Sequence, residues 1–295
     1  MTVSAGDEPT TAFQLDVGTD ELYAVFSPDA TRLLTGGRVA QIWDAESGRC
    51  LRTMDAHTGP ITALCWGSGG EEVATGGFND HLVRLWDVGS GECLRTFEGH
   101  AGYIRSVAFS PSGHHLVSGS GDGTIRLWER SSGECLRVLE GHTDGVYHAI
   151  FDASERRVLS GGRDATLRLW DLGSGACVCL LRGAPYHVQC LEWSADQRHF
   201  ISCSRDIRLC DADEGRLERV FQGHGDTIRS VRWSADETLI LSASHDRTVR
   251  VWDAATGQCL RVLQGRGECV VAAMWGAPGS VLSCDSSGGL RVWRL

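Results

Sequence analysis

The sequence contains no lysine, and all 28 of its basic residues are arginines. This absence excludes Schiff-base chemistry on a lysine side chain. Because arginine codons are GC-rich, the bias also favours a bacterial source. Tyrosine is scarce, with four residues in 295, so the positions of these four are informative about where a partner could bind.

Long hydrophobic runs are missing as well. No apolar stretch approaches the roughly 20 residues of a membrane span, and Met1–Thr11 has neither the basic start nor the apolar core of a secretory signal. We therefore expect a soluble, cytoplasmic protein with no membrane partner and a disordered tail over residues 1–11. The net charge of −10 argues against a nucleic-acid partner.

Twelve cysteines are present, but their positions do not favour disulfides. Five occupy one equivalent place in successive repeats, at the start of a predicted fourth strand: Cys50, Cys93, Cys135, Cys177 and Cys259. Such places lie beyond the roughly 7 Å Cα separation that a disulfide tolerates, so we expect small, buried, reduced thiols. The CxC pair Cys177 and Cys179 has no matching second pair, so no metal and no cofactor are expected.

The stretch from Gly99 to Glu129 is the unit that recurs along the chain. Its β-branched and aromatic runs are separated by Pro-Ser-Gly and Gly-Asp-Gly, which form tight turns, so the unit predicts antiparallel strands joined by hairpins. The expected strands are Tyr103–Phe109, His115–Gly119, Thr124–Trp128 and, after another turn, Cys135–Leu139. The unit is therefore a four-stranded meander.

The unit repeats about every 42 residues, which is the period of four-stranded propeller blades. Equivalent positions in seven copies are Trp43, Trp86, Trp128, Trp170, Cys210, Trp252 and Trp293. The recurring Gly-His and Trp-Asp dipeptides, such as Gly99-His100 and Trp86-Asp87, resemble the WD-repeat family over about residues 12–295. The resemblance implies an all-β fold, a single seven-bladed β-propeller of four-stranded antiparallel blades.

The chain stops two residues after Trp293, so the last copy lacks a fourth strand. Ala12–Asp16 precedes the first copy at the place where a fourth strand belongs. We therefore expect the N-terminal strand to complete the last blade and close the ring, which also removes an exposed strand edge.

Two copies depart most from the pattern. In the fifth, Ala184 replaces the histidine of Gly-His and Cys210 replaces the tryptophan. In the seventh, Arg266 replaces that histidine and Ser287 replaces the aspartate of the turn between the second and third strands. The geometry of these two blades is the least predictable.

A histidine, a serine or threonine, an aspartate and a tryptophan recur at one spacing and suggest a hydrolase triad. However, a catalytic site is normally built once, whereas this set appears in four copies, and the resemblance implies a buried hydrogen-bond network that braces each blade. We expect no catalytic residue and no enzyme activity. The four sets are His57, Thr75, Asp80 and Trp86; His100, Ser118, Asp122 and Trp128; His142, Ser160, Asp164 and Trp170; and His224, Ser242, Asp246 and Trp252.

The resemblance also implies that positions at the start of each inner strand, and before the turn aspartate, reach one rim of the central channel, where relatives bind peptides. Five residues beyond the Gly-His histidine lie Thr62, Arg105, Tyr147 and Arg229, matched by Tyr23, Gln189 and Val271 in the other copies. Arginine and tyrosine are enriched in the rim set, and both are common binding anchors. The expected partner-binding residues are Tyr23, Tyr103, Arg105, Tyr147, Arg163, His187, Arg205, Arg229 and His245.

These residues predict a non-catalytic scaffold or recognition module whose rim binds an acidic or phosphorylated protein segment. The chain would act as a monomer or as a subunit of a hetero-complex. A simpler interpretation is that arginine, the only cation of this chain, serves the surface and the tyrosines pack between blades. The alternatives are an accessory or sensor subunit of a bacterial kinase, protease or nucleotide-hydrolysing complex, an enzyme with a site in the channel, and a nucleic-acid binder.

Arginine also recurs in the third strands, and there its regular period favours side-chain stems packed on the blade faces over contacts with nucleic acid. These residues are Arg84, Arg126, Arg168, Arg208, Arg250 and Arg291.

Overall fold

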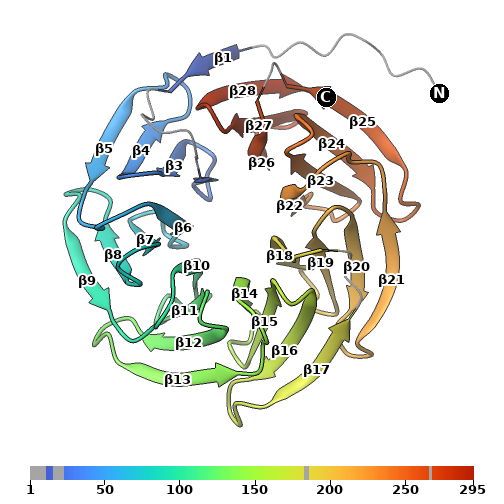
Figure 1. The fold of residues 1–295 in the computed structure, drawn as a ribbon. Helices are drawn as coiled ribbons and strands as arrows, with labels where there is room; N and C mark the ends of the chain where they lie inside the picture. Colours follow the sequence, from blue (N-terminus) through green and yellow to red (C-terminus); the bar gives the residue numbers. More distant parts are fainter. Residues whose placement is uncertain (1–10, 16–22, 183–185, 266–267) are drawn as a thin grey trace.

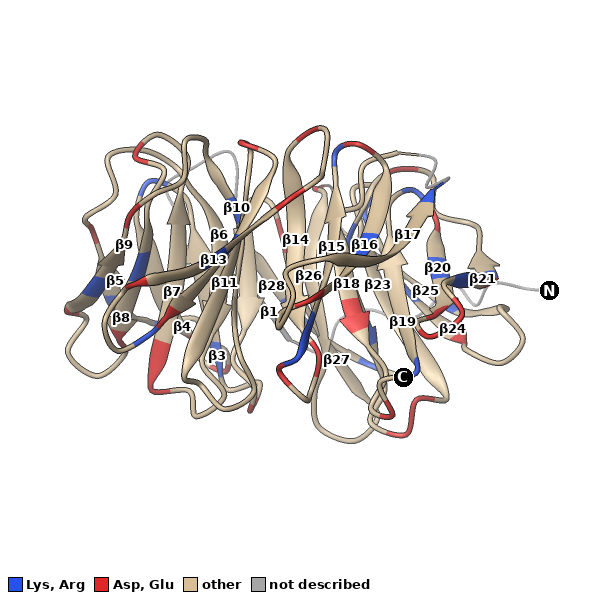
Figure 2. Ribbon diagram, turned by 90° about the horizontal axis from the view of Figure 1, so that it is seen from below, with Lys and Arg blue, Asp and Glu red and all other residues tan. Residues whose placement is uncertain are grey.

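The computed structural model describes residues 11–15, 23–182, 186–265 and 268–295. Seven four-stranded antiparallel sheets stand around a central axis like the blades of a propeller (Figure 1). Seen edge-on, the strands run between two layers of loops (Figure 2). The predicted all-β, seven-bladed propeller is confirmed. No described segment forms a helix that is long and apolar enough to cross a membrane.

In every blade the strands follow one another from the channel outwards. The first contains β2 (Tyr23–Phe26), β3 (Arg32–Gly36), β4 (Ala40–Asp44) and β5 (Cys50–Met54). The second contains β6 (Ile61–Trp66), β7 (Glu72–Gly77), β8 (Val83–Asp87) and β9 (Cys93–Phe97). The third contains β10 (Ile104–Phe109), β11 (His115–Ser120), β12 (Thr124–Glu129) and β13 (Cys135–Glu140). The fourth contains β14 (Val146–Phe151), β15 (Arg157–Gly162), β16 (Thr166–Asp171) and β17 (Cys177–Arg182).

The fifth blade contains β18 (Cys190–Trp193), β19 (His199–Cys203), β20 (Ile207–Asp211) and β21 (Arg216–Phe221). The sixth contains β22 (Ile228–Trp233), β23 (Leu239–Ser244), β24 (Thr248–Asp253) and β25 (Cys259–Gln264). The seventh contains β26 (Val270–Trp275), β27 (Ser280–Asp285), β28 (Gly289–Arg294) and, from the other end of the chain, β1 (Thr11–Gln14).

The turns of the third blade show why these strands form where they do. Gly113 and Gly123 adopt φ values of 74° and 81°, in the left-handed region that glycine tolerates without a steric penalty. Their amides donate to Ser110 O and Ser120 O at 2.9 and 3.1 Å, which closes both hairpins. The four strands predicted for this unit match the observed ones to within one residue at each end.

Strand β1 pairs antiparallel with β28, and Thr11 lies opposite Val292. The backbone amide of Leu15 continues the contact by donating to Gly288 O at 3.0 Å. The predicted closing strand, Ala12–Asp16, is confirmed with a start one residue earlier, and Asp16 lies outside the described residues. The seventh blade therefore has three strands from the C-terminal end of the chain and a fourth from the N-terminal end.

The hydrophobic core is divided among the interfaces between blades. Seven clusters of buried residues are found in the described chain, and each spans two adjacent blades. Trp128 of β12, for example, packs with Phe97 and Leu85 of the preceding blade. At the closure, Leu15 and Leu290 pack with Phe26 and Trp43 of the first blade. Burial of these apolar surfaces holds neighbouring blades together.

The burial predicted for the repeated cysteines is wrong. Each of the five begins the fourth strand of its blade as expected, but Cys50, Cys93, Cys177 and Cys259 are exposed and Cys135 is half-buried. The reason is that the outermost strand has no sheet beyond it, so its first residue faces solvent. All twelve cysteines are free thiols, as expected.

Removal of residues 1–14 should destabilise the protein, because β28 loses its backbone partner. Loss of this short ladder should cost about 2–5 kcal/mol in the free energy of unfolding, and the exposed edge of β28 should promote self-association. Urea unfolding and size-exclusion chromatography measure both effects. The matched control removes only residues 1–10, where the sequence predicts a disordered tail. Equal stability of the two truncated chains would contradict the closure.

Candidate functional site

The side chains that line the central channel are directed there by irregularities in the innermost strands. In five blades the pairing of the first and second strands shifts register by one residue, and the extra residue is in each case the one five places beyond the Gly-His position. A β-bulge of this kind bends the strand and redirects a side chain. The residues at the bulges are Thr62, Arg105, Tyr147, Arg229 and Val271.

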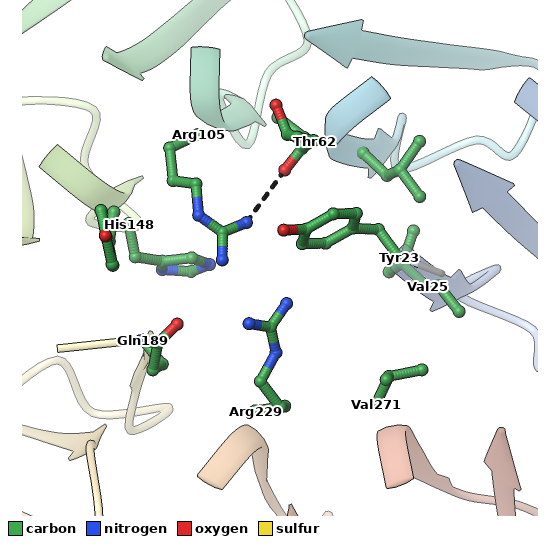
Figure 3. A pocket seen from close by; sticks show the side chains of 12 residues that line it. Tyr23, Val25, Thr62, Arg105, His148, Gln189, Arg229 and Val271 are labelled. Atoms are coloured by element: carbon green, nitrogen blue, oxygen red, sulfur yellow. Dashed lines mark hydrogen bonds between the residues drawn. The ribbon is translucent and has the colours of Figure 1, made fainter. Parts of the chain in front are cut away.

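A cavity of about 120 Å³ lies in the channel at this level. All seven blades contribute to its wall, and the equivalent residues of the other two blades are Tyr23 and Gln189. Figure 3 shows the side chains converging from the surrounding strands. The described residues that line it are Tyr23, Ala24, Val25, Thr62, Ala63, Leu64, Arg105, Tyr147, His148, Gln189, Arg229 and Val271.

Two arginines dominate the charge of this cavity. The Cζ atoms of Arg105 and Arg229 lie 4.7 and 5.1 Å from the centroid of one ring, that of Tyr23. Arg105 also lies 5.1 Å from the ring centroid of Tyr147 and donates from Nη1 to Thr62 O at 3.2 Å. Neither arginine forms an ion pair with a carboxylate among the described residues. Burial lowers the pKa of Arg105, and the nearby charge of Arg229 lowers it further.

His148 belongs to the cavity, although no sequence argument selected it. Its Nδ1 atom is buried and has no hydrogen-bond partner within the described part of the protein. Burial lowers the pKa of His148, and the charges of Arg232 and Arg105 act in the same direction. The residue follows a bulge, so its orientation depends on an irregularity that hydrophobic periodicity does not reveal.

A glutamate and an arginine lie on neighbouring inner strands but do not line the cavity. Glu192 Oε2 accepts a hydrogen bond from the Trp233 amide at 2.8 Å. Burial raises the pKa of Glu192 to about 7, and the charge of Arg232 opposes this effect. The sequence analysis did not identify either residue.

Aromatic and arginine side chains from the second to fifth blades lie beside the cavity on one face, which we call the channel face and define by Phe78, Tyr103, Arg163, Tyr186, His187 and Arg205. Tyr103 stacks on Phe78 with ring centroids 4.9 Å apart. The ring of His187 meets Tyr147 edge-on at 5.7 Å, so the face and the cavity are continuous. Phe78 and Tyr186 are 43% and 49% exposed.

The arginines of the channel face are more exposed than those of the cavity. Arg205 lies over the ring of Tyr186 at 4.3 Å. Arg163 Nε lies 3.7 Å from Asp144 Oδ2, and both side chains are about half exposed. His187 Nδ1 lies 3.0 Å from the backbone oxygen of Arg163 and donates to it. Burial lowers the pKa of His245, the last predicted rim residue, and the nearby charge of Arg229 adds to this.

Eight of the nine residues predicted to bind a partner form two adjoining sets, and the ninth, His245, lies between β23 and β24 in neither set. Tyr23, Arg105, Tyr147 and Arg229 line the cavity inside the channel instead of its rim. Tyr103, Arg163, His187 and Arg205 lie on the channel face. The sequence analysis missed the roles of His148, Phe78 and Tyr186.

The repeated His-Ser-Asp-Trp set forms a continuous hydrogen-bond network inside the third blade. Trp128 Nε1 donates to Ser118 Oγ at 2.8 Å, and Ser118 Oγ lies 2.7 Å from His100 Nε2. His100 Nδ1 lies 2.8 Å from Asp122 Oδ2. The serine hydroxyl can thus donate to Nε2 while the Nδ1–H group donates to the carboxylate.

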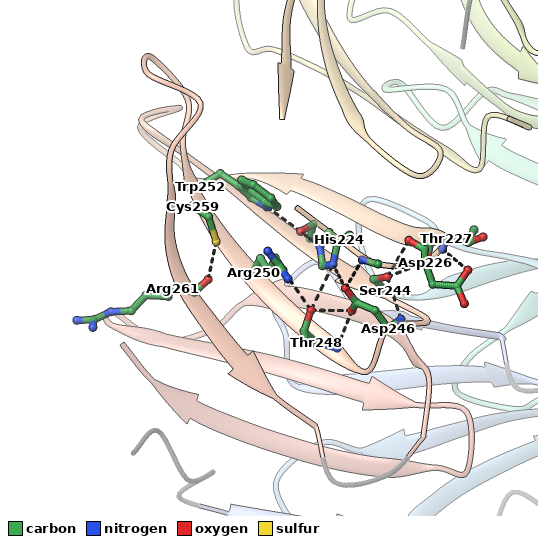
Figure 4. A network of polar contacts seen from close by, with 12 residues as sticks. His224, Asp226, Thr227, Ser244, Asp246, Thr248, Arg250, Trp252, Cys259 and Arg261 are labelled. Atoms are coloured by element: carbon green, nitrogen blue, oxygen red, sulfur yellow. Dashed lines mark hydrogen bonds and ion pairs between the residues drawn. The ribbon is translucent and has the colours of Figure 1, made fainter. Parts of the chain in front are cut away.

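The same contacts recur in the second, fourth and sixth blades, and Figure 4 shows the sixth. Ser118, Ser160, Ser242 and Thr75 are each 0% exposed. No substrate can reach a hydroxyl that is covered in this way. The arrangement therefore braces the turn and the inner strand of each blade and does not present a nucleophile.

In the fifth and seventh blades, which lack the histidine, a third-strand arginine is the partner of the turn aspartate. In the fifth blade Arg208 Nε lies 3.2 Å from Asp206 Oδ1. In the seventh, Asp285 pairs with Arg291 at 2.5 Å and accepts from Gly289 N at 2.7 Å, so it takes the role of the aspartate that Ser287 replaces. Ala184 and Arg266, which replace the histidines, lie outside the described residues.

Three other third-strand arginines pack against the buried tryptophans, as predicted from their period. The Cζ atoms of Arg126, Arg168 and Arg250 lie 5.8–5.9 Å from the ring centroids of Trp128, Trp170 and Trp252. In the second blade, Arg84 instead donates to Asp80 at 2.6 Å.

Within the described chain, one group of side chains has the spacing of metal ligands. His199, Asp211 and Glu218 place one ligand atom each within 4.8 Å of one another at the outer part of the fifth blade. His199 Nε2 already pairs with Glu218 Oε2 at 3.4 Å. The group is thus a contact between His199 and Glu218 with one further carboxylate nearby.

A comparison with protein-family models matches the WD domain, G-beta repeat family in five segments: residues 48–87, 91–129, 133–171, 175–209 and 215–253. Together these segments cover more than half of the chain. A comparison with curated proteins found no match.

Replacement of Ser118 by alanine should lower stability without affecting a catalytic step. The substitution leaves Trp128 Nε1 and His100 Nε2 buried without a partner, which should cost about 2–4 kcal/mol in the free energy of unfolding. Urea unfolding measures this cost. The matched control is Ser131→Ala, at an exposed turn of the same blade. Hydrolysis of an activated ester that disappears in Ser118→Ala would show a catalytic role instead.

Acid should destabilise the blades through their buried histidines. Burial lowers the pKa values of His57, His142 and His224, so the unfolded chain binds more protons than the folded one once the pH falls below the ordinary value of about 6.5. Stability is then lost as the pH falls from about 7 towards 5. The raised pKa of Glu192 acts in the opposite direction over the same range.

The contribution of one histidine is isolated by comparing wild type with His142→Gln. The wild-type free energy of unfolding should fall more steeply between about pH 7 and 5 than that of the variant, because only the wild type has this buried site to protonate. The Glu192 contribution is common to both proteins and cancels. Urea titrations at each pH measure the two slopes. Parallel slopes would contradict the proposed linkage.

Proposed function

Since this chain belongs to the WD-repeat family, whose propellers generally serve as protein–protein interaction scaffolds, we propose that its channel face binds an acidic or phosphorylated protein segment. Arg163 and Arg205 would contact the charges of the segment, and Tyr103 and Tyr186 would contact its apolar parts. Arg105 and Arg229 would receive an anionic group at the channel. No catalytic step is part of this function.

The observation that carries the proposal is the pair Arg105 and Arg229 in the channel. The protein as a whole has an excess of acidic residues, and acidic residues occur in loops on both faces (Figure 2). Nevertheless, the described residues that line the cavity include two arginines and no acidic residue. Positive charge concentrated in a recess attracts and orients negative partners.

The simpler explanation, that arginine is the only available cation and has to be placed somewhere, accounts for other positions better than for these two. Arg126, Arg168 and Arg250 pack on tryptophans, and Arg84 and Arg291 pair with aspartates. Arg105 and Arg229 both lie beside the Tyr23 ring without a described carboxylate to balance their charge. An external anion supplies that balance.

The exposed aromatics support a peptide as the form of the partner. Phe78 and Tyr186 present large apolar surfaces at the edge of the channel face. Aromatic and arginine side chains are the types that most often contribute strongly to protein interfaces. A segment crossing this face could place its side chains on these rings while its charge meets the arginines.

The double variant Arg163→Glu/Arg205→Glu should lose affinity for acidic and phosphorylated peptides. We expect a loss of about tenfold or more, since two attractive contacts become repulsive. Fluorescence polarisation with an arrayed peptide library measures binding. The control is Arg198→Glu, an exposed position in the turn between β18 and β19 on the opposite face. Equal binding of neutral and acidic peptides, or equal affinities of the two variants, would contradict the proposal.

A further inference from the structure

We propose that the channel cavity is a binding site for one phosphoryl dianion, held between Arg105 and Arg229. The inference rests on the proposed function and names the chemical group recognised at its centre. The dianion can arrive as free inorganic phosphate or as the phosphoryl group of a phosphorylated side chain. Both sources present the same oxygens to the same arginines.

The first support is the convergence of two positive charges. Arg105 and Arg229 come from the third and sixth blades, and both guanidinium groups lie within 5.1 Å of the centroid of the Tyr23 ring. In Figure 3 the two groups point towards the middle of the channel from different sides. Like charges that approach in a recess repel each other. An anion between them replaces this repulsion by two attractive contacts.

The second support is the set of polar atoms around the arginines. The hydroxyl group of Tyr23 points into the same space (Figure 3), and Gln189 is part of the same lining. His148 borders this space with a buried Nδ1 that has no partner among the described residues. A buried polar atom without a hydrogen bond is rare in folded proteins and calls for an explanation. A bound anion, with the water that accompanies it, can supply the missing contacts.

The third support is the match of charge and shape. Two guanidinium groups carry two positive charges, and a phosphoryl group carries about −1.5 to −2 near pH 7. One arginine is sufficient for the two oxygens of a carboxylate, which lie in a single plane. Two arginines that approach from different sides suit a tetrahedral group with three or four oxygens. The cavity volume of about 120 Å³ is several times larger than the roughly 15 Å³ that one water molecule requires.

The remaining arginines near the channel do not compete for this role. Arg163 lies on the face beside Asp144, and Arg205 covers the ring of Tyr186. These residues are suited to contact the chain that carries a phosphoryl group. The cavity and the channel face therefore divide recognition into an anion site and a peptide surface, joined by the contact between Tyr147 and His187.

Isothermal titration calorimetry with inorganic phosphate, at constant ionic strength and about pH 7.5, tests the anion site directly. We expect saturable binding of one phosphate per chain, and acetate should bind at least about tenfold more weakly, since it offers fewer oxygens and half the charge. Arg105→Gln/Arg229→Gln should abolish measurable binding. Arg198→Gln, on the opposite face, should bind like wild type.

Folding of the variants is checked by thermal unfolding, because Arg105 also packs on Tyr147. If the double variant does not fold, Arg229→Gln alone provides the test, since this side chain has no described hydrogen bond, and it should weaken phosphate binding about tenfold or more. Absence of phosphate binding to the wild type, affinity for acetate equal to that for phosphate, or unchanged binding by the folded arginine variants would each overturn the proposal.

A second titration distinguishes the two sources of the dianion. The probes are inorganic phosphate and the peptide Gly-Gly-pSer-Gly-Gly, each with wild type and with Arg163→Glu/Arg205→Glu. Tighter binding of the peptide that is lost in this variant supports a phosphorylated segment. Equal or tighter binding of inorganic phosphate, insensitive to the variant, supports the free anion.

These results also separate this inference from the proposed function. Phosphate binding that depends on Arg105 and Arg229, without any peptide binding at the channel face, would support the anion site and contradict the proposed peptide partner. Peptide binding that depends on Arg163 and Arg205 but not on Arg105 and Arg229 would support the peptide partner and contradict the anion site.

Discussion

The backbone pairing of β1 with β28 closes a ring in which every blade packs against two neighbours. No blade can bury its apolar faces alone, because each of the seven hydrophobic clusters found in the described chain is shared between adjacent blades. Closure brings the first and seventh blades together through Leu15, Leu290 and Phe26. The central channel exists only as a consequence of this ring, so the cavity and the channel face both depend on one short antiparallel ladder.

Within the ring, the residues that recur from blade to blade are structural, whereas the candidate functional residues vary between blades. The network of histidine, hydroxyl, aspartate and tryptophan is buried and occurs in four blades, and in the fifth and seventh blades an arginine contacts the turn aspartate instead. In these two blades the aspartate keeps a cationic partner although the histidine is missing. The seven equivalent positions of the channel, by contrast, carry five residue types, with arginine and tyrosine occurring twice each. Their chemistry therefore varies around the ring, which a purely structural role would not require.

Much of the fold could be predicted because each strand and turn depends on neighbours in the sequence. Gly113 and Gly123 mark their turns through a conformation that other residues avoid, and the strands of the third blade follow from them. Burial was harder to predict. Cys50 and Cys259 were expected to be buried but are exposed, because their strands lie at the outside of the ring. His148 was missed because a register shift beside Val146 changes the direction of the strand.

The sequence by itself determined the seven repeats, the polar network and the identity of the residue at each channel position. It also placed arginine and tyrosine at positions that would face the channel. Only the tertiary structure decided that Arg105 and Arg229 approach one tyrosine ring without a described carboxylate beside them. The physical reason is that these residues lie in different blades, and their separation in space depends on ring closure and on the bulges that turn each side chain inward. The distance of Arg105 or of Arg229 from the Tyr23 ring cannot be predicted from local sequence propensity.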